Sequence, residues 1–345
     1  MAKPVRIAVM GAGLIGKRHI EHVLASDRAT LSAIVDPTPV GKILAEQHRV
    51  PWFRSFAEMV THDKPEGVII ATPNQVHVAN GIDAVSAGIP VLVEKPIADD
   101  VASGLKLVEA AEKAKVPLLT GHHRRHNLMI QRAKAIIDSG KLGRIITVHG
   151  FFWLSKPAAY FEPQWRREKG AGPVFMNLIH DVDLLRYLVG EISSVIARES
   201  NAVRGNAVED VSVMLLSFAN GALGTVNVSD SVVAPWSWEQ TTGENPVYPH
   251  TDQTCYFIGG THGSLTVPRL EFWSNVGERS WWEPFTIERT IASDADPLRL
   301  QVDHFARVIR GEEAPLVSGR EGLQTLKVIE AVKTSARSGQ SVTLT

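Results

Sequence analysis

The sequence predicts an α/β protein of two domains, in which a doubly wound parallel sheet is followed by a domain with a mostly antiparallel sheet. Three observations support this fold class. As far as Gly121, short and almost wholly apolar runs alternate with segments of helical periodicity, which is typical of a parallel sheet covered on both faces. A glycine-rich turn follows the first of these runs. Beyond Gly121, strand-like runs follow one another through tight turns.

The first domain is predicted over residues 1–121. Its expected strands are 5–10, 31–35, 67–71, 90–94 and 117–120. Between them, apolar residues recur at helical spacing in the segments 17–26, 74–87 and 99–114. Strands and helices that alternate in this way predict a parallel sheet with helices on both faces.

The second domain is predicted over residues 122–345. We expect helices at 128–139, at 173–188 with its proline in the first turn, and at 297–310 and 319–337. The expected strands are 144–153, 195–200, 208–218, 222–229, 254–258, 263–267, 270–273 and 285–290. Ala219-Asn220-Gly221 is a strong hairpin signal between two of these strands. The last helices can pack back on the first domain.

The glycine-rich turn is Gly11-Ala12-Gly13-Leu14-Ile15-Gly16, a G-x-G-x-x-G motif directly after the first apolar run. Gly11 allows a tight turn from strand to helix, Gly13 lets the backbone approach a pyrophosphate, and Gly16 lets helix and strand pack closely. The N–H groups at the start of the following helix bind phosphate charge. The turn therefore predicts a dinucleotide site that includes Leu14 and Ile15.

An acidic residue completes this motif and selects the cofactor. The second apolar run ends on Asp36, which follows Gly16 by twenty residues. A carboxylate at this place accepts hydrogen bonds from the adenosine ribose hydroxyls and repels the 2′-phosphate of NADP. Because Pro37 and Thr38 follow with no arginine beside them, we expect NAD, with NADP less favoured.

Composition excludes several classes of protein. The chain of 345 residues is 44% apolar, so a sizeable core is available, and its net charge of −1 gives no indication of a nucleic-acid partner. One cysteine, Cys255, allows no internal disulfide, and the first strand begins too early to leave room for a signal peptide. The sequence contains no run of about 18 apolar residues, so we expect no membrane span. We therefore expect a cytoplasmic protein.

Two segments at strand ends are candidates for the cofactor groove. Ala71-Thr72-Pro73-Asn74 ends the third strand, and His77 follows one turn into the next helix. Thr72 and Asn74 can cap that helix and line the groove as well. Capping alone suffices to explain both residues.

Glu94-Lys95-Pro96 stands at the carboxyl end of the next strand, the edge of a doubly wound sheet at which ligands bind. A lysine beside a nicotinamide acts as a general acid or base toward a hydroxyl or carbonyl group. Partial burial and a neighbouring cofactor lower the pKa of such a lysine toward neutrality. By itself, the tripeptide favours a simpler interpretation, a surface lysine after a strand.

A third candidate lies on the main helix of the second domain. Asn177 precedes His180 by three residues and Asp181 by four, so it shares a helix face with both. Leu178 and Val182 are expected to serve the core. A histidine on an otherwise apolar helix is more often structural than catalytic.

Taken together and in this order, the glycine turn, Ala71-Thr72-Pro73-Asn74, Glu94-Lys95-Pro96 and a His-bearing helix resemble the Gfo/Idh/MocA oxidoreductases. The resemblance spans essentially the whole chain. It implies a Rossmann domain for NAD and a C-terminal α/β domain on an open, largely antiparallel sheet. It also implies a homodimer or homotetramer formed through that sheet.

The resemblance further implies that Lys95 is the active-site lysine and that His180 contacts the reacting hydroxyl. One departure matters, because relatives that act on inositol carry an aspartate where this chain has Met176. A thioether cannot accept a proton or bind a sugar hydroxyl strongly, which disfavours inositol itself. Of the nearby acids, Asp183 projects closer to the face of His180 than Asp181 does and is the expected support.

The resemblance also draws attention to the segment after the last strand of the first domain, which contains His122, His123, Arg124, Arg125 and His126. Relatives often have an arginine here that borders the nicotinamide, so Arg124 or Arg125 is a candidate to hold a carboxylate or polyol. A solvated interdomain loop explains the segment as well. We expect no metal, because no carboxylate cluster accompanies the histidines.

Aromatic side chains are concentrated in two further stretches, around Trp165 and in the loop 233–253, which holds Trp236, Trp238 and Tyr248. Tryptophan faces stack on sugar rings, and they anchor subunit interfaces equally well. Trp165 is the candidate for substrate binding.

The sequence therefore predicts an NAD-dependent dehydrogenase that oxidises a secondary alcohol of a sugar, cyclitol or related polyol, or reduces the ketone. The expected partner is a small-molecule substrate. Three alternatives remain open: an NAD-dependent glycosidase, a dehydrogenase of carboxylated cis-diols, and a non-catalytic regulator that senses the dinucleotide. The substrate and the direction of the reaction are not specified by the sequence.

Overall fold

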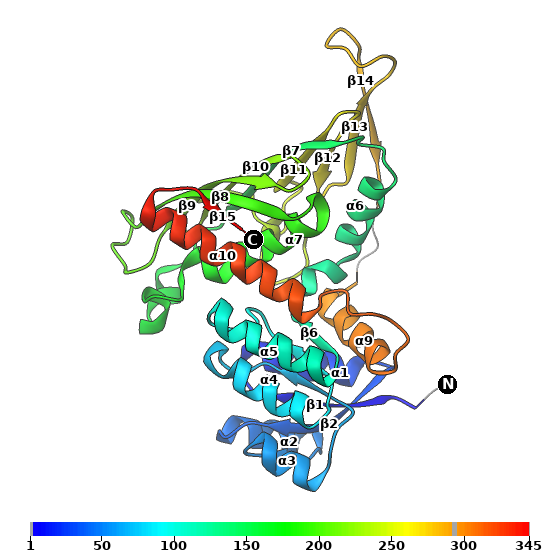
Figure 1. Cartoon of the computed structure of the whole chain (residues 1–345), viewed down its shortest axis with the longest axis vertical. Coiled ribbons are helices and arrows are strands. Elements are labelled where there is room, and N and C mark those ends of the chain that lie inside the picture. The colour runs from blue at the N-terminus through cyan, green and yellow to red at the C-terminus, as the bar shows by residue number, and fades with distance from the viewer. Residues whose placement is uncertain (1–2, 292–294, 345) are drawn as a thin grey trace. The chain divides into compact units, whose positions relative to one another are not determined.

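The computed structural model describes residues 3–291 and 295–344, which form two compact units. The N-terminal unit comprises the described residues up to His126 together with 295–326. The C-terminal unit comprises those of 127–294 and 327–345. Each unit is built round its own sheet (Figure 1). The predicted fold class is confirmed, since the first sheet is parallel and the second mostly antiparallel.

Within the described residues, the N-terminal sheet has six parallel strands in the order β3-β2-β1-β4-β5-β6. The strands are β1 (Val5–Met10), β2 (Ala29–Val35), β3 (Trp52–Phe53), β4 (Gly67–Ile70), β5 (Val91–Val93) and β6 (Leu118–Thr120). The helices of this unit are α1 (Leu14–Ala25), α2 (Pro39–His48), α3 (Phe56–His62), η1 (Asn74–Val76), α4 (His77–Ser86), α5 (Val101–Ala114), η2 (His123–His126) and α9 (Pro297–Ile309). The strand order reverses between β1 and β4, which is where ligands bind in such sheets.

Helices cover both faces of this sheet, as the apolar character of its strands predicts. Successive side chains of β1 point to opposite faces. Ile7 packs with Phe305 of α9 on one face, and Ala8 packs with Leu107 of α5 on the other. Leu323, from the first half of helix α10 (Gly319–Ser338), joins the second of these clusters. The chain therefore returns to the N-terminal unit near its end to complete the core.

The C-terminal sheet has nine strands in the described chain, in the order β14-β13-β12-β11-β7-β10-β9-β8-β15. They are β7 (Ile145–Trp153), β8 (Ile192–Ser200), β9 (Val211–Phe218), β10 (Leu223–Ser229), β11 (Tyr256–Gly260), β12 (Ser264–Val267), β13 (Glu271–Asn275), β14 (Phe285–Arg289) and β15 (Val342–Thr343). The helices are α6 (Leu128–Asp138), η3 (Ala158–Phe161), η4 (Gln164–Arg167), η5 (Val174–Leu178), α7 (Ile179–Val189) and α8 (Trp238–Thr241), with the second half of α10. Strands β7 and β10 pair in parallel, and the other pairs are antiparallel.

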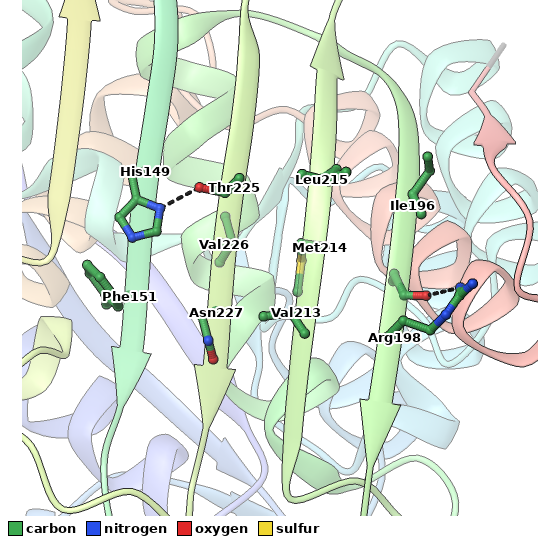
Figure 2. Close-up of a pocket in the computed structure, with 11 residues that line it drawn as sticks. His149, Phe151, Ile196, Arg198, Val213, Met214, Leu215, Thr225, Val226 and Asn227 are labelled. Atoms are coloured by element: carbon green, nitrogen blue, oxygen red, sulfur yellow. Dashed lines mark hydrogen bonds between the residues drawn. The ribbon is translucent and has the colours of Figure 1, made fainter.

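The two faces of this second sheet differ. One face packs on the helices, since Phe152 of β7 and Leu216 of β9 share a buried cluster with Leu185 of α7. The other face is open along β7, β10, β9 and β8 (Figure 2). On that face Val213 and Leu215 are 45% and 54% exposed, which leaves an apolar surface in contact with solvent.

The hairpin predicted at residues 219–221 is confirmed, because Phe218 N–H donates to the Ala222 carbonyl at 2.9 Å between β9 and β10. The sequence gives no indication of the two-residue strands β3 and β15, nor of α2, α3 and the single turn α8. The two-residue strands and the short helices α3 and α8 are too short to show a period, whereas α2, with ten residues, is long enough and was not expected.

Candidate functional site

Four of the predicted cofactor segments meet at the carboxyl edge of the N-terminal sheet. They follow β1, β2, β4 and β5 directly, and all these strands are parallel. Backbone hydrogen bonds continue the ladder into the loops, since Ala71 N–H donates to the Met10 carbonyl at 2.8 Å and Glu94 N–H to the Ile70 carbonyl at 2.9 Å. The structure therefore brings these segments together in the N-terminal unit.

The glycine turn has the geometry that its sequence predicts. Gly11 has a φ of +95°, and a Cβ there would collide with the carbonyl oxygen of Ala71. A Cβ on Gly16 would collide with the carbonyl oxygen of Gly11, so helix α1 and the turn are in close contact. A Cβ on Gly13 would meet no atom within 4 Å, and Leu14 beside it is 87% exposed.

Helix α1 begins at this turn with Gly13 as its N-cap and without a side-chain cap. The backbone N–H groups of its first turn are therefore not occupied by a capping side chain. Open space at Gly13 together with uncapped donors fits the pyrophosphate of a dinucleotide. NAD therefore suits the residues at this edge of the sheet.

Asp36 binds the glycine turn and the residues that follow β2. Its Oδ2 accepts a hydrogen bond from Ala12 N–H at 2.7 Å, and its Oδ1 accepts one from Thr38 N–H at 2.8 Å. The Thr38 hydroxyl also donates to Oδ1. Oδ1 thus accepts two hydrogen bonds already, whereas Oδ2 keeps a second lone pair that can accept from a ribose hydroxyl. The predicted role of Asp36 is thus compatible with its position and remains a prediction.

The Thr72 loop departs from expectation in one respect. The N-cap residues of η1 and α4 are Pro73 and Val76, so neither Thr72 nor Asn74 caps a helix. The Thr72 hydroxyl instead accepts a hydrogen bond from the Asn80 side chain at 3.2 Å. The prediction of capping was wrong because a 3₁₀ turn precedes the α-helix and moves its start.

His77 is buried and holds two loops of this edge together. Its Nδ1 lies 2.9 Å from the carbonyl oxygen of Pro96, and its Nε2 lies 2.8 Å from that of Thr72. The ring therefore bridges the loops after β4 and β5. His77 is 1% exposed, and its predicted part in the cofactor site remains a prediction.

Lys95 is half-buried on the loop after β5, and the residue before it is anchored in the interior. Glu94 is 5% exposed, and its Oε1 lies 2.7 Å from Nε2 of His19 on α1. Burial raises the pKa of Glu94, but the hydrogen bond from His19 and the positive charges of His19, His123 and Lys95 outweigh it and lower the pKa to about 2. Glu94 is therefore an anionic support for the loop.

The Arg- and His-containing segment after β6 is mostly interior. Arg124 and Arg125 are 4% and 3% exposed, and Arg125 pairs with Glu321 of α10 at 2.9 Å. Burial, assisted by the charge of His304, lowers the pKa of His126 to about 3. Within the described ranges, no group of three His, Cys, Asp or Glu side chains is arranged to hold a metal ion. That either arginine binds substrate remains a prediction.

In the C-terminal unit, His180 lies near the start of α7, directly after the π-helical turn η5. A regular α-helix is predicted over 173–188, but the structure begins it with a wider turn. The Val174 N–H donates to Oε1 of the buried Glu209 at 2.9 Å, and Lys333 of α10 binds the same carboxylate at 2.6 Å. π-Helical turns are rare in proteins, and those that occur are frequently found at functional sites.

The acids beside His180 have separate surroundings. Asp181 is buried and accepts a hydrogen bond from the hydroxyl of the buried Tyr256, so it belongs to the core of this unit. Asp183 is also buried, at 1% exposure. Its predicted role as the support of His180 remains a prediction, and so does the role of His180 itself.

Two of the aromatic candidates differ in position. Trp165 on η4 is 52% exposed, and the guanidinium of Arg166 lies 5.2 Å from its ring centre. Trp238 is 1% exposed and its indole N–H donates to Glu244 at 3.0 Å, so it is a core residue. Trp238 was expected in an aromatic-rich loop, because the helix α8 on which it lies spans a single turn and shows no period.

Sequence reasoning missed two residues near these sites, His19 and Lys156. His19 shares the buried face of α1 with Gly16 and Val23, and that spacing is the signal that points to the sheet. Lys156 binds the Asn177 side chain at 2.8 Å. No sequence signal pairs a loop lysine with a helix residue twenty-one positions later.

Comparisons with known proteins agree with the fold. Two models of one oxidoreductase family match the chain: the NAD-binding Rossmann fold over residues 5–122, and the C-terminal alpha/beta domain over residues 134–344. The rhizopine catabolism protein MocA of Rhizobium meliloti is 26% identical over 332 residues, 94% of this chain and 93% of that protein. D-apiose dehydrogenase of Paraburkholderia graminis is 27% identical over 357 residues, 98% of this chain and 89% of that enzyme.

A solved structure is also similar over the full length. The WlbA dehydrogenase from Bordetella pertussis, in complex with NADH and UDP-GlcNAcA, has a TM-score of 0.80 at 27% identity, and the match covers 99% of both chains. Among the helices that the structure describes, none has the length and apolar character that crossing a bilayer requires.

Proposed function

Because the chain belongs to the Gfo/Idh/MocA family of oxidoreductases, we propose that it oxidises a secondary alcohol of a sugar, cyclitol or related polyol with NAD, or reduces the corresponding ketone. The chain is an NAD(P)-dependent oxidoreductase acting on CH–OH groups, and its N-terminal unit is the NAD-binding domain. The choice of substrate and the roles of single residues are proposed here.

The observation that carries the proposal is the set of loops at one edge of the parallel sheet. The turn with Gly13 after β1 is open and uncapped, and Lys95 follows β5, which β4 separates from β1 in the same sheet. When bound, NAD supplies the acceptor for a hydride. The chain itself must then supply a group that takes up the hydroxyl proton, which is the role we assign to Lys95.

We assign Lys95 as general base in oxidation and general acid in reduction. The loop that carries Lys95 is held by Glu94 on His19 and by Pro96 on His77, so its position is determined by interior contacts. A cation at this place also stabilises negative charge that develops on the substrate oxygen. His180 is assigned to orient the reacting hydroxyl by hydrogen bonding.

The side chain at position 176 restricts the substrate. Met176 offers a thioether where inositol-specific relatives carry an aspartate, so the site lacks that acceptor for a sugar hydroxyl. Asn177 beside it is half-buried and is assigned to hydrogen-bond the substrate. A polyol or sugar other than inositol itself is therefore the favoured substrate.

One assay separates this function from its alternatives. Purified enzyme is incubated with NAD or NADP and a panel of aldoses, polyols, cyclitols and sugar acids, and reduced nicotinamide is followed by absorbance. Net NADH formation supports the proposal. Glycoside cleavage without net NADH identifies an NAD-dependent glycosidase. Tight NAD binding with no reaction on any member identifies a dinucleotide-sensing protein.

The proposal includes self-association through the open face of the C-terminal sheet. This face presents apolar side chains of neighbouring strands, among them Ile196, Val213 and Leu215 (Figure 2). A contiguous apolar surface of this kind is typical of a protein–protein interface. We assign a second copy of the chain as its partner, in a homodimer or homotetramer.

A further inference from the structure

Lys156 is a buried cation that the proposed reaction does not use. It follows β7 on the loop toward η3, and 9% of its side chain is exposed. Its Nζ donates to Oδ1 of Asn177 at 2.8 Å and lies 3.3 Å from Oδ2 of Asp230. The ammonium group thus joins the π-helical turn before His180 to the end of strand β10.

A network of charges holds Lys156 in place. Asp230 is 1% exposed, and its Oδ1 also accepts a hydrogen bond from Arg204 at 2.5 Å. Arg204 binds the equally buried Asp210 at 3.0 Å. The backbone contributes as well, because Lys156 N–H donates to the Asp230 carbonyl at 3.0 Å. Two cations face two carboxylates, so the cluster is balanced in charge and its members are fixed by several contacts each.

Aromatic contacts restrict the ammonium further. Nζ of Lys156 lies 4.7 Å from the ring centre of Tyr160, and the guanidinium of Arg166 lies 4.1 Å from the same ring. Burial lowers the pKa of Lys156, while the charge and hydrogen bond of Asp230 act in the opposite direction. A lysine so enclosed has little freedom to leave Asn177.

The contact determines which end of the Asn177 amide faces Lys156. An ammonium group has donors and no acceptor, so it binds the carbonyl oxygen of the amide and not the nitrogen. The Nδ2 end of Asn177 is therefore turned away from Lys156. We propose that Lys156 is a positioning residue that presents Nδ2 of Asn177 as a hydrogen-bond donor to an oxygen atom of the substrate.

This inference deepens the proposed function and rests on it, because the donor serves a bound substrate. Because Lys156 already binds Oδ1 of Asn177 and the thioether of Met176 is only a weak acceptor, these two side chains offer a substrate mainly the Nδ2 donor. An oxygen that only accepts, such as a carboxylate or carbonyl oxygen, fits this donor better than a hydroxyl. The favoured substrate class is therefore a sugar acid or a keto sugar.

The first test uses matched substrates. The enzyme is assayed with NAD on D-glucuronate against D-glucose, D-galacturonate against D-galactose, and D-gluconate against D-sorbitol. Asn177→Asp keeps an oxygen for Lys156 but replaces the donor with a carboxylate. We expect kcat/KM on the acid of a reactive pair to fall by about 10- to 100-fold, and less on the neutral partner. Unchanged kcat/KM on every reactive pair overturns the proposal.

The second test varies the lysine. Lys156→Met should raise KM for the acid about tenfold and leave KM for NAD unchanged, whereas Lys156→Arg, which keeps the donors, should restore most of the loss. A purely structural lysine would lower the unfolding midpoint without shifting acid against neutral substrate. Lys141→Met serves as the control, because Lys141 pairs with Glu288 at the surface. An equal effect of the control variant overturns the assignment.

The third test needs no activity. Unfolding in urea is compared for Lys156→Met, Asn177→Leu and the double variant. Two side chains in contact should show non-additive changes in unfolding free energy. Additive changes in unfolding free energy would overturn only the positioning role of Lys156 and would leave the proposed function standing. If the changes are non-additive but the enzyme neither turns over nor binds any member of the substrate panel, the proposed function is wrong. The substrate role of Asn177 then fails with it.

Discussion

Nε2 of His19 lies 2.7 Å from Oε1 of Glu94, and both side chains are buried. His19 belongs to the helix that begins at the glycine turn, and Glu94 directly precedes Lys95. The contact therefore ties the cofactor turn to the loop with the proposed general base. Displacing either partner changes the position of Lys95 without altering that residue itself.

Glu94→Gln should destabilise the protein in a pH-dependent way. The pKa of Glu94 is lowered from 4.5 to about 2, so its contribution to stability is complete above pH 4.5 and is lost as the pH falls toward 2. The shift corresponds to about 3 kcal/mol. Urea unfolding should show a large difference between variant and wild type at pH 7 and a smaller one at pH 3. The surface variant Glu112→Gln should show little difference at either pH, and a gap that stays constant with pH would refute the linkage.

Lys95→Met should abolish turnover and leave NAD binding largely intact. Loss of a general acid or base typically costs about 10²- to 10⁴-fold in rate. Steady-state kinetics on the best panel substrate give kcat, and fluorescence titration gives the affinity for NADH. A variant that keeps more than about a tenth of wild-type kcat would show that Lys95 is incidental.

NAD should be preferred over NADP by at least about tenfold, or about 1.4 kcal/mol. Asp36 carries the charge that repels a 2′-phosphate, and its two oxygens are held by Ala12 and Thr38. Asp36→Ser should narrow the preference. The measurement is a titration of both cofactors, and equal or tighter binding of NADP by the wild type contradicts the claim.

His180→Ala should lower kcat strongly, because the reacting hydroxyl loses its orienting group. Asp183→Asn should lower it less, as expected of a support. Met176→Asp should leave the fold intact and extend activity toward cyclitols, since it restores an acceptor to the helix. The three variants are compared by kcat, KM and unfolding midpoint. Full kcat for His180→Ala would remove this helix from the mechanism and leave only Lys95.

Leu215→Lys should shift the protein to a smaller species. Leu215 lies in the middle of the open sheet face, between Ile196 and Thr225 on the neighbouring strands. A buried charge at such an interface is costly unless it is paired. Light scattering after size-exclusion chromatography measures the mass, with Leu24→Lys on the exposed face of α1 as the control. A wild-type protein that runs as a monomer would rule out the proposed self-association.

The sequence predicted the elements whose period is long enough to be recognised. The parallel sheet, the glycine turn and the lysine at the end of β5 all depend on local patterns, and the structure places them at one edge. The side-chain contacts that hold these segments could not be predicted from the sequence, because partners such as His19 and Glu94 are seventy-five residues apart. Pairing over such a distance depends on packing and not on spacing along the chain.

The same limit applies to the second unit. A helix with His180 was predicted, but its π-helical start depends on Glu209 and Lys333, which come from other elements.

In the N-terminal unit, Thr72 was expected to cap a helix from residue type alone, and the 3₁₀ turn that precedes α4 removed that role. Residue type and local spacing thus predicted where along the chain the candidate residues lie. They did not predict the residues from other elements that bind them.

The N-terminal unit is completed by residues 295–326, which lie near the end of the chain. Val302 and Phe305 of α9 and Leu323 of α10 are buried in its core. Domains generally fold as units during synthesis, with the N-terminal one first. Here the first sheet lacks the part of its cover that α9 and α10 supply until residues 297–326 have been translated. A nascent chain that stops short of these helices therefore leaves part of the apolar surface of the first sheet without its cover.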